Sequence, residues 1–513
     1  FNGPFGARQV VYADWTASGR AYGPIEDYLR ERVLPFYANT HTSTSISGLQ
    51  STCFRAEARQ IVQQAVNANS RLDVVLFTGS GATGAINKMA GILGLKVPLT
   101  GEVAPEQRPV VLCGPFDHHS NILPWRESNA DVFTVREDRS GCGLDQAHLV
   151  ELLQKYHTRP LVVGSFSAAS NVTGVQEDVN GVSALLHRFG ALALWDYAAA
   201  GPYVNIDMNP VLPGDHPDRA FVHKDAVFIS PHKFVGGVNS PGILIAKKRL
   251  FDNAVPAGES VGGGTVYFVK EDGHRYLSNR VEREEGGTPD VVGAIRAGLA
   301  FQLKQSIGVE SIAQMDARWA AKIREALGTH PNIALLGPGA HGAVAPGADS
   351  QADAGGIASA LPIASFLIRH GPSGRLFLHY NFVSALLNDV FGVQTRGGCM
   401  CAGPYAQRLL GMERKVIDAI EAELVNDPKN CEYLRPGFSR LSLAYFASEE
   451  EVDFCLEAVR AIAENGWRLL PLYRFNRRTG EWKHKSQFTK FVGRLWLEDA
   501  GLLDEVSAPS SSP

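Results

Sequence analysis

DVVLFTGSGATGAINKMAGIL, residues 73–93, holds an apolar run, a glycine-rich turn and a segment of helical periodicity, in that order. Short apolar runs that end at turn residues are typical of buried strands. The same order recurs downstream, where the apolar runs are VVLCG (110–114), LVVGSFS (161–167), ALALWD (191–196), AVFIS (226–230) and GILIAKK (242–248). This repetition predicts an α/β fold, with a large, mostly parallel sheet covered by helices and a smaller α+β domain after it.

Changes of pattern along the chain predict four parts. Residues 1–25 form an irregular N-terminal arm, and a helix is expected to begin near Pro24. The large domain is predicted over 26–300 and the small domain over 301–465, with a flexible insertion at 337–360 that is rich in Gly, Ala and Asp. Residues 466–513 form a basic and aromatic extension that ends in a disordered Ser- and Pro-rich tail.

The composition is that of an ordinary globular protein without a strong charge. Of 513 residues, 45% are hydrophobic and 20% charged, and the formal net charge is −4. No overall basic field attracts nucleic acid or an anionic membrane, and the apolar runs are far shorter than the roughly 20 residues of a membrane-spanning helix. We expect no membrane partner. The 466–490 extension could bind nucleic acid, but packing on the domain or docking of a protein partner is the favoured interpretation.

The seven cysteines are an odd number at low density, which argues against a disulfide framework and favours a reducing compartment. Only Cys399 and Cys401 lie close enough in sequence to indicate chemistry. The sequence opens at Phe1, so a targeting segment could precede it. A cytoplasmic location is expected, and an organelle remains open.

A lysine and a carboxylate each follow a predicted strand. Lys233 follows AVFIS in the segment ISPHKFVGG, beside Ser230 and His232, and strand ends are where α/β sheets bind ligands. The alternative is a solvated surface lysine. Asp196 ends ALALWD, where a buried carboxylate needs a partner. The alternative is an N-cap for a following Ala-rich helix.

Three further segments offer polar groups that could contact a ligand. In FTGSGATGAIN, the N–H groups of Gly81, Ala82 and Thr83 could bind an anion at a helix N-terminus, although a tight strand-to-helix turn would look the same. FDHHSNILPW contributes His118, and SAASNVTG contributes Asn171. The pair His118 and His119 lacks the spacing of helical metal ligands, so no metal site is expected.

Two segments of the small domain complete the set of candidates. RGGCMCAGPY contains Arg396, Cys399 and Cys401, and SRLSLAYF contains Arg440. Cys401 could be a nucleophile or a buried inert thiol. Each arginine could bind a substrate carboxylate through its two-pronged guanidinium, or form a surface salt bridge.

Taken together, these residue types meet the demands of pyridoxal 5'-phosphate (PLP). That cofactor needs a lysine to hold it as an imine, a carboxylate on its pyridine nitrogen, an anion cradle for its phosphate and a ring stacked on its own. The imine could form on Lys233, and the carboxylate could be that of Asp196. The phosphate cradle could be the glycine-rich turn with Ser230 and His232, and the stacked ring could be His118.

At these residues the chain resembles the class V aminotransferase family of PLP enzymes, and within it the cysteine desulfurases. The resemblance covers roughly residues 10–465 and rests on an ordered set of segments: YADWTASGRA, HTSTSISG, FTGSGATGAIN, FDHHSNILPW, SNVTG, ALALWD, SPHKFVGG, SVGGGTVY, EEGGTPDVVGAI, RGGCMCAGP and SRLSLAYF. It implies fold type I and a homodimer.

The resemblance also implies a role for each matching residue. Lys233 matches the lysine that binds PLP, Arg440 the substrate carboxylate clamp and Cys401 the cysteine that forms a persulfide. The remaining matches concern the cofactor: Asp196 at the pyridine nitrogen, His118 stacked on the ring, Asn171 near the ring hydroxyl, Ala82, Thr83, Ser230 and His232 at the phosphate, and Thr288 at the phosphate of the partner subunit.

The implied reaction converts L-cysteine to L-alanine and leaves a persulfide on Cys401, from which a sulfur-acceptor protein could be served. Two departures leave the substrate open: Ala199 stands where the family usually has glutamine, and Cys399 adds a second thiol. A similar Cys-x-Cys loop occurs in the desulfurase domain of molybdenum-cofactor sulfurases. The alternatives are another class V reaction (C–S lysis, selenocysteine lysis, epimerisation or transamination) and a non-catalytic scaffold with a relic site.

Overall fold

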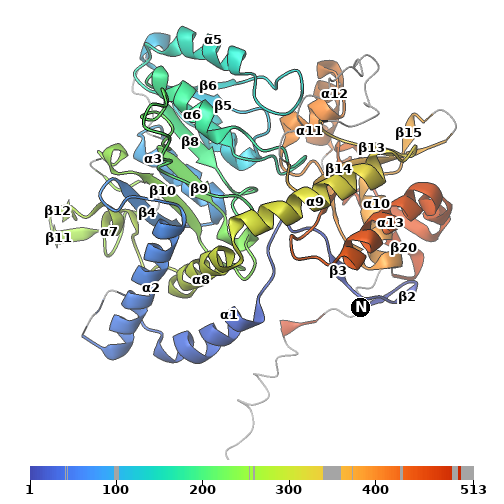
Figure 1. The fold of residues 1–513 in the computed structure, drawn as a ribbon, viewed down its shortest axis with the longest axis horizontal. Helices are drawn as coiled ribbons and strands as arrows, with labels where there is room; N and C mark the ends of the chain where they lie inside the picture. Colours follow the sequence, from blue (N-terminus) through green and yellow to red (C-terminus); the bar gives the residue numbers. More distant parts are fainter. Residues whose placement is uncertain are drawn as a thin grey trace, which may run out of the picture.

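The computed structural model describes residues 1–40, 42, 44–96, 103–253, 255–257, 260–338, 360–371, 374–427, 431–487 and 495–497. Apart from its ends, the insertion predicted at 337–360 lies outside the described residues, and so does the predicted tail. The described chain forms a large sheet with its helices on one side of the molecule and a smaller sheet with its helices on the other (Figure 1). No helix among the described residues is long and apolar enough to cross a membrane.

The large sheet has seven strands in the order β4-β10-β9-β8-β7-β5-β6. The five strands from β9 to β6 run parallel to one another, and β10 is antiparallel to both of its neighbours, β4 and β9. All the strands quoted from the sequence are present, so the predicted mostly parallel sheet is confirmed. Their bounds are β4 (Asp73–Thr78), β5 (Val110–Cys113), β6 (Asp131–Thr134), β7 (Val162–Ser167), β8 (Leu192–Asp196), β9 (Ala226–Ile229) and β10 (Gly242–Lys247).

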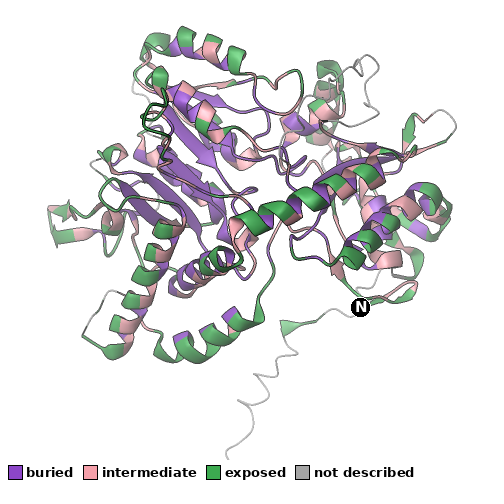
Figure 2. Cartoon of the chain, viewed as in Figure 1, coloured by how far each residue is buried: buried purple, intermediate pink, exposed green. Residues whose placement is uncertain are grey.

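Both faces of this sheet are buried, which explains why its strands read as continuous apolar runs (Figure 2). Alternate residues of one strand enter different cores: Val75 packs on one face, and Val74 and Leu76 on the other. The first face is covered by α2 (Ile46–Ala65), α5 (Gln146–Tyr156), α6 (Val179–Arg188) and α8 (Val291–Ile307), and the second by α3 (Gly81–Ile92) and α4 (Leu123–Arg126).

The small domain is built on an antiparallel sheet of the order β13-β14-β18-β17, with β15 paired to β14. These strands are β13 (Ile333–Leu335), β14 (Ile363–His370), β15 (Leu376–Phe377), β17 (Arg396–Gly398) and β18 (Phe438–Ser442). Its helices include α9 (Val309–Gly328), α10 (Tyr380–Leu386), α11 (Gly403–Leu409), α12 (Arg414–Asn426) and α13 (Glu449–Asn465). α8 spans the boundary proposed at residue 300, and α9 runs on from it into the small domain (Figure 1).

The N-terminal arm pairs with the small domain and then contacts the large one. β3 (Val11–Tyr12) runs parallel to β16 (Val393–Gln394), and Asp14 forms an isolated bridge with Ser442. Farther along, the Gly19 N–H donates to the His232 carbonyl at 2.9 Å. The arm therefore crosses the seam between the domains before the predicted helix, α1 (Gly23–Tyr28), begins.

The described part of the basic extension packs on the small domain. β19 (Tyr473–Asn476) and β20 (Glu481–His484) form a hairpin beside α10. The Trp482 ring lies 4.9 Å from the Phe382 ring, and the Tyr473 hydroxyl donates to Asp389 at 2.8 Å. Some aromatic residues of the extension, including Tyr473 and Trp482, therefore form part of the core of the small domain.

A buried ion cluster fixes the strand that leads to the glycine-rich turn. Glu285, just after α7 (Arg280–Glu284), accepts from the Phe77 N–H at 2.6 Å and pairs with Arg55 at 2.7 Å and Arg59 at 2.8 Å. Burial raises the pKa of Glu285, but Arg59 and Arg55 outweigh it and hold that pKa below its usual range. The carboxylate therefore ties α2 and β4 together in its charged form.

We expect Glu285→Gln to lower the free energy of unfolding by about 3 kcal/mol, because two arginines and a buried N–H lose their shared partner. Urea denaturation followed by circular dichroism measures the change. Glu282→Gln, at an exposed position on α7, three residues before Glu285, is the matched control and should stay within about 0.5 kcal/mol of the parent. Equal stability of the two variants would contradict the role given to the cluster.

Candidate active site

A cavity of about 210 Å³ lies where β8 and β9 end and the small domain meets the large one. This is the carboxyl edge of the parallel strands, where α/β proteins bind ligands. The cavity brings together the predicted site residues of both domains: Ala82, Thr83, His118, Asn171, Asp196, Ser230, His232, Lys233, Arg396, Cys401 and Arg440. Thr288 is not among them.

Lys233 enters the cavity from the single helical turn Pro231–Lys233 that follows β9. Burial, with the positive charges of Arg440 and Arg396, lowers the pKa of its amine to about 8 against the opposing effect of Asp196. A neutral amine is the form that attacks an aldehyde, so a lysine in this setting is prepared for an imine.

Asp196 is the last residue of β8 and is only 4% exposed. One of its oxygens accepts from the Ala198 N–H at 2.8 Å. Residues 198–203 form turns, so the alternative of an N-cap for a following helix is wrong. Burial raises the pKa of Asp196, while the Ala198 hydrogen bond and Lys233 lower it. A protonated ring nitrogen would satisfy this carboxylate, since no Lys or Arg of the described chain forms an ion pair with it.

The glycine-rich turn forms an open helix N-terminus against the segment before Lys233. α3 begins at Gly81, whose φ is +56°, and Ser80 makes no side-chain cap. A Cβ at Gly81 would lie 2.8 Å from the His232 ring and 2.9 Å from Ser230 Oγ, so only glycine fits. The Ala82 N–H donates to Ser230 Oγ at 2.9 Å. The result is a cradle of N–H and hydroxyl groups with the chemistry of a phosphate site.

Ser120, which the sequence did not single out, links this cradle to the histidine. Its Oγ lies 2.7 Å from Thr83 Oγ1 and 3.1 Å from His118 Nδ1. The Ser120 N–H also donates to His118 Nδ1. Burial, followed by the positive charge of Lys233, lowers the pKa of His118 to about 3. His118 is therefore a neutral ring, which suits stacking on an aromatic cofactor.

The loop of Cys401 is held over the cavity by hydrogen bonds from the large domain. Asn171 Nδ2 donates to the Met400 carbonyl at 2.8 Å, and the His119 N–H donates to the Cys401 carbonyl at 2.7 Å. The Gly403 N–H donates to His119 Nε2 at 2.9 Å. His119, to which the sequence assigned no role, thus holds the cysteine loop in place. Cys401 lines the cavity, whereas Cys399 packs against an apolar cluster to which both domains contribute.

Arg440 lies in β18 and is only 2% exposed, so the alternative of a surface salt bridge is wrong. Its Nη1 donates to the Asn171 carbonyl at 2.9 Å, and its Nη2 pairs with Asp14 at 2.6 Å. Asp14 is a site residue that the sequence argument missed, because its contact lies 426 positions away. Arg396 faces Arg440 in the β17–β18 register and is exposed at the cavity rim.

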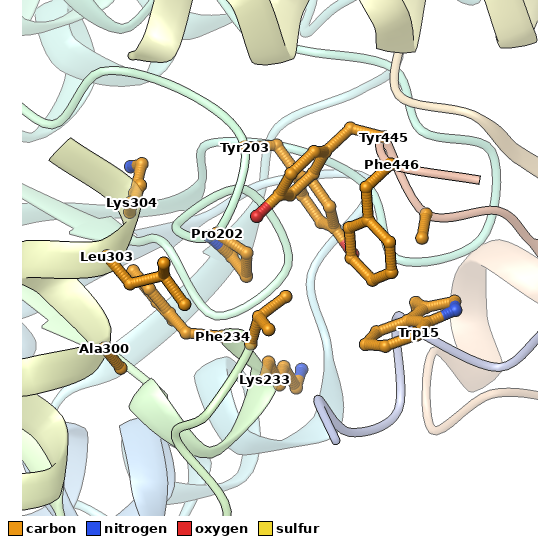
Figure 3. Close-up of a pocket in the computed structure, with 12 residues that line it drawn as sticks. Trp15, Pro202, Tyr203, Lys233, Phe234, Ala300, Leu303, Lys304, Tyr445 and Phe446 are labelled. Carbon is orange, nitrogen blue, oxygen red and sulfur yellow. The ribbon is translucent and has the colours of Figure 1, made fainter. Parts of the chain in front are cut away.

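A second, much smaller cavity of about 10 Å³ lies behind Lys233 and is walled by Trp15, Tyr203, Tyr445 and Phe446 (Figure 3). Lys304 also borders it, but its amine donates to the carbonyls of Gly201 and Val204, both at 2.6 Å. The amine of Lys304 therefore stabilises the loop that follows Asp196. Burial lowers its pKa to about 7.

Thr288 lies on the exposed surface outside both cavities, 3.4 Å from Asn39 Nδ2. Within one chain it does not reach the site. Its predicted contact is with the cofactor of a partner subunit, so that prediction stays open.

The cavity fits PLP on grounds of its own chemistry. Within the described part of the chain, Asn171 Oδ1 is buried without a hydrogen-bond partner, and the carboxylate of Asp196 feels the charge of Lys233 but forms no ion pair. An anion cradle and a neutral imidazole lie beside a lysine of lowered pKa. Each of these features is costly in an empty protein interior and is satisfied by a ring with an N–H, a hydroxyl oxygen and a phosphate.

The aminotransferase class-V family model matches residues 11–372, and the chain belongs to that family. It is thus a member of a family of PLP-dependent enzymes. A probable cysteine desulfurase of Methanothermobacter thermautotrophicus is 25% identical over 90% of this chain and 96% of its own. A probable cysteine desulfurase of Pyrococcus abyssi is 25% identical over 62% of this chain and 73% of its own.

Solved structures show the same fold. The apo cysteine desulfurase of Thermococcus onnurineus has a TM-score of 0.67 at 21% identity, covering 89% of this chain and 95% of its own. The cysteine desulfurase CsdA of Escherichia coli has a TM-score of 0.63 at 20% identity, covering 88% and 94%. These likenesses confirm fold type I.

The pKa of Lys233 predicts how cofactor uptake depends on pH. Because only the neutral amine reacts, the rate at which the cofactor-free protein binds PLP should rise about fivefold from pH 7 to pH 8 and less than about twofold from pH 8 to pH 9. Stopped-flow absorbance measures the rate. Lys233→Ala should give no imine absorbance at any pH. A rate that is flat across this range would show that the amine is not desolvated as described.

Proposed function

We propose that this protein is a cysteine desulfurase that converts L-cysteine to L-alanine and carries the released sulfur as a persulfide on Cys401. The observation that carries the proposal is that Cys401, from the small domain, lines the same cavity as Lys233 and Asp196, from the large domain. The named relatives support it, since they are described as cysteine desulfurases.

In this proposal the cofactor is held by Lys233, Asp196, Asn171 and the cradle around Gly81. When bound, PLP supplies an electron sink for bonds at the substrate α-carbon. Lys233, as a neutral amine, takes the α-proton and returns a proton to the product. Arg440 and Arg396 bind the substrate carboxylate, and the apolar wall around Lys233 keeps out water.

The sulfur step balances without an external oxidant. The Cys401 thiolate attacks the sulfur of L-cysteine, a sulfur–sulfur bond forms, and the carbon–sulfur bond breaks with its electron pair going to the β-carbon. A proton then completes the methyl group of L-alanine. Cysteine and one enzyme thiol thus yield alanine and one persulfide.

A homodimer is part of this proposal. Thr288 is exposed and lies outside the cavity of its own chain, as a residue serving a neighbouring subunit must be. A sulfur-acceptor protein would approach the small-domain side, where the Cys401 loop reaches the cavity. The other class V reactions and the relic scaffold remain alternatives, and they differ from desulfuration in their products.

Cys401→Ala should lose at least about a hundredfold in alanine formation from L-cysteine, because it removes the nucleophile but not the cofactor site. Cys399→Ala is the matched control, two residues away and outside the cavity, and should keep most of the activity. Both variants should show the absorbance of bound PLP.

The measurement is alanine and sulfide released per minute, with mass spectrometry for a 32-dalton adduct on the peptide of Cys401. Full sulfur transfer by the Cys401→Ala variant would refute the role of Cys401 as the nucleophile. PLP absorbance in the parent without any alanine would favour another class V reaction, and no PLP binding at all would favour the relic scaffold.

Asp14 competes with the substrate for Arg440, because a carboxylate already occupies the guanidinium at 2.6 Å. Asp14→Asn should therefore lower KM for L-cysteine by about fivefold with little change of kcat, since one repelling charge is removed. Binding of cysteamine, which has no carboxylate, should not change. A rise in KM would show instead that Asp14 positions Arg440.

A further inference from the structure

A third cavity, far from Lys233, is lined mainly by arginine and lysine side chains. Its volume is about 450 Å³, within the range of small-molecule sites. Four separate segments form it, and they contribute Arg71, Leu72, Asn209, Pro210, Arg219, His223, Lys247, Lys248 and Arg249. Five of these nine residues are Arg or Lys and none is acidic, in a chain whose net charge is −4.

This basic cavity lies at the opposite end of the sheet from the active site. β10 begins at Gly242, whose N–H donates to the Gly79 carbonyl in the glycine-rich turn, and ends at Lys247 in the cavity wall. Five steps along a strand span roughly 17 Å. A ligand in the basic cavity therefore cannot occupy the PLP site.

Buried carboxylates hold two of the cations in place. Lys247 donates to Asp73 at 2.7 Å and to Asn209 Oδ1 at 2.6 Å, and Arg249 pairs with Asp225. The side chains of Asp73 and Asp225 are 1% and 0% exposed. These pairs lie beneath the cavity and make its floor rigid without placing negative charge on its surface.

Within the described ranges, the other three cations have no carboxylate partner. Lys248 Nζ donates to the Ser70 carbonyl at 2.6 Å, and neither Arg71 nor Arg219 forms a salt bridge with any residue that the structure describes. Three uncompensated positive charges on one concave surface repel one another unless an anion binds.

The neighbouring histidines do not offer a metal site instead. Ligand atoms of His187, His223 and Asp225 lie within 4.8 Å of one another. However, the two imidazole rings are stacked, with centroids 4.1 Å apart and planes at 15°. Nitrogen lone pairs lie in the ring plane, so two parallel rings cannot both direct them at one ion. His187 Nε2 also already bonds Asp225 at 2.8 Å.

We propose that the basic cavity binds a phosphate-bearing small molecule with at least two negative charges. Arginine forks and lysine amines are the usual ligands of phosphate oxygens. Among the described residues no Phe, Tyr or Trp lines the cavity, and the His223 ring is already stacked on His187, so recognition rests on the charged group and not on a stacked base. A concave site of this size suits a compact anion better than a polymer backbone.

Inorganic pyrophosphate is the probe, titrated into the PLP-loaded protein by calorimetry at low salt so that the cofactor site is already filled. We expect saturable binding of one pyrophosphate per chain, which weakens as salt is raised. Arg71→Glu combined with Arg219→Glu should weaken it by about tenfold or more. Arg477→Glu combined with Arg478→Glu makes the same change of net charge on the exposed hairpin and should leave it unchanged.

The proposal is overturned if pyrophosphate does not bind saturably, or if the two double variants lose the same amount of pyrophosphate affinity. Thermal melting and PLP absorbance confirm that each variant is folded. If the charge-reversal variant does not fold, the milder double variant Arg71→Gln and Arg219→Gln replaces it in the titration. A short single-stranded oligonucleotide that displaces pyrophosphate at a lower concentration than free phosphate does would assign the cavity to nucleic acid and overturn the small-molecule proposal.

Discussion

The burial of Arg440 is the constraint on which the active site depends. A guanidinium that is 2% exposed must be paired and hydrogen-bonded, or the protein pays a large desolvation penalty. Arg440 belongs to the small domain, and its two partners come from elsewhere: the Asn171 carbonyl of the large domain and the Asp14 carboxylate of the arm. One buried cation thus sets how the two domains and the arm meet. The side-chain amide of Asn171 donates to the Met400 carbonyl, so the residue that binds Arg440 also positions the cysteine loop.

Removal of water then sets the protonation of the groups around the cavity. Burial is the largest influence on Lys233, His118 and His232, and it lowers the pKa of each. The positive charges of Arg440 and Arg396 act in the same direction on Lys233 and His118. Two neutral histidines, a lysine that loses its proton easily and two arginine cations therefore coexist in one small space. That combination favours an anionic substrate and cofactor, because their negative charges interact with cations that are already desolvated.

Much of the large domain could be predicted from the sequence, because strands buried on both faces leave a plain signature of apolar runs ended by turn residues. Residues that follow such strands, Asp196 and Lys233 among them, meet at one edge of the sheet whatever the details of packing. Asp14 and His119 were missed because their partners, Arg440 and Gly403, are brought to them only by the domain arrangement. Lys304 was missed for the same reason, since helical periodicity does not reveal that its amine braces a loop about 100 residues earlier.

The two thiols of the Cys-Met-Cys loop show where a sequence pattern fails. Residues two apart in a strand face the same side, so Cys399 and Cys401 would be expected to point together. β17 ends at Gly398, however, and both Met400 and Cys401 adopt left-handed backbone angles, with φ of +57° and +55°. Two such residues in succession are strained, and they persist only because Asn171 and His119 bond their carbonyls. The turn they make reverses the chain, which leaves Cys399 in the apolar cluster and presents Cys401 to the cavity. The different placement of the two thiols is therefore a property of the backbone, fixed by hydrogen bonds from the other domain.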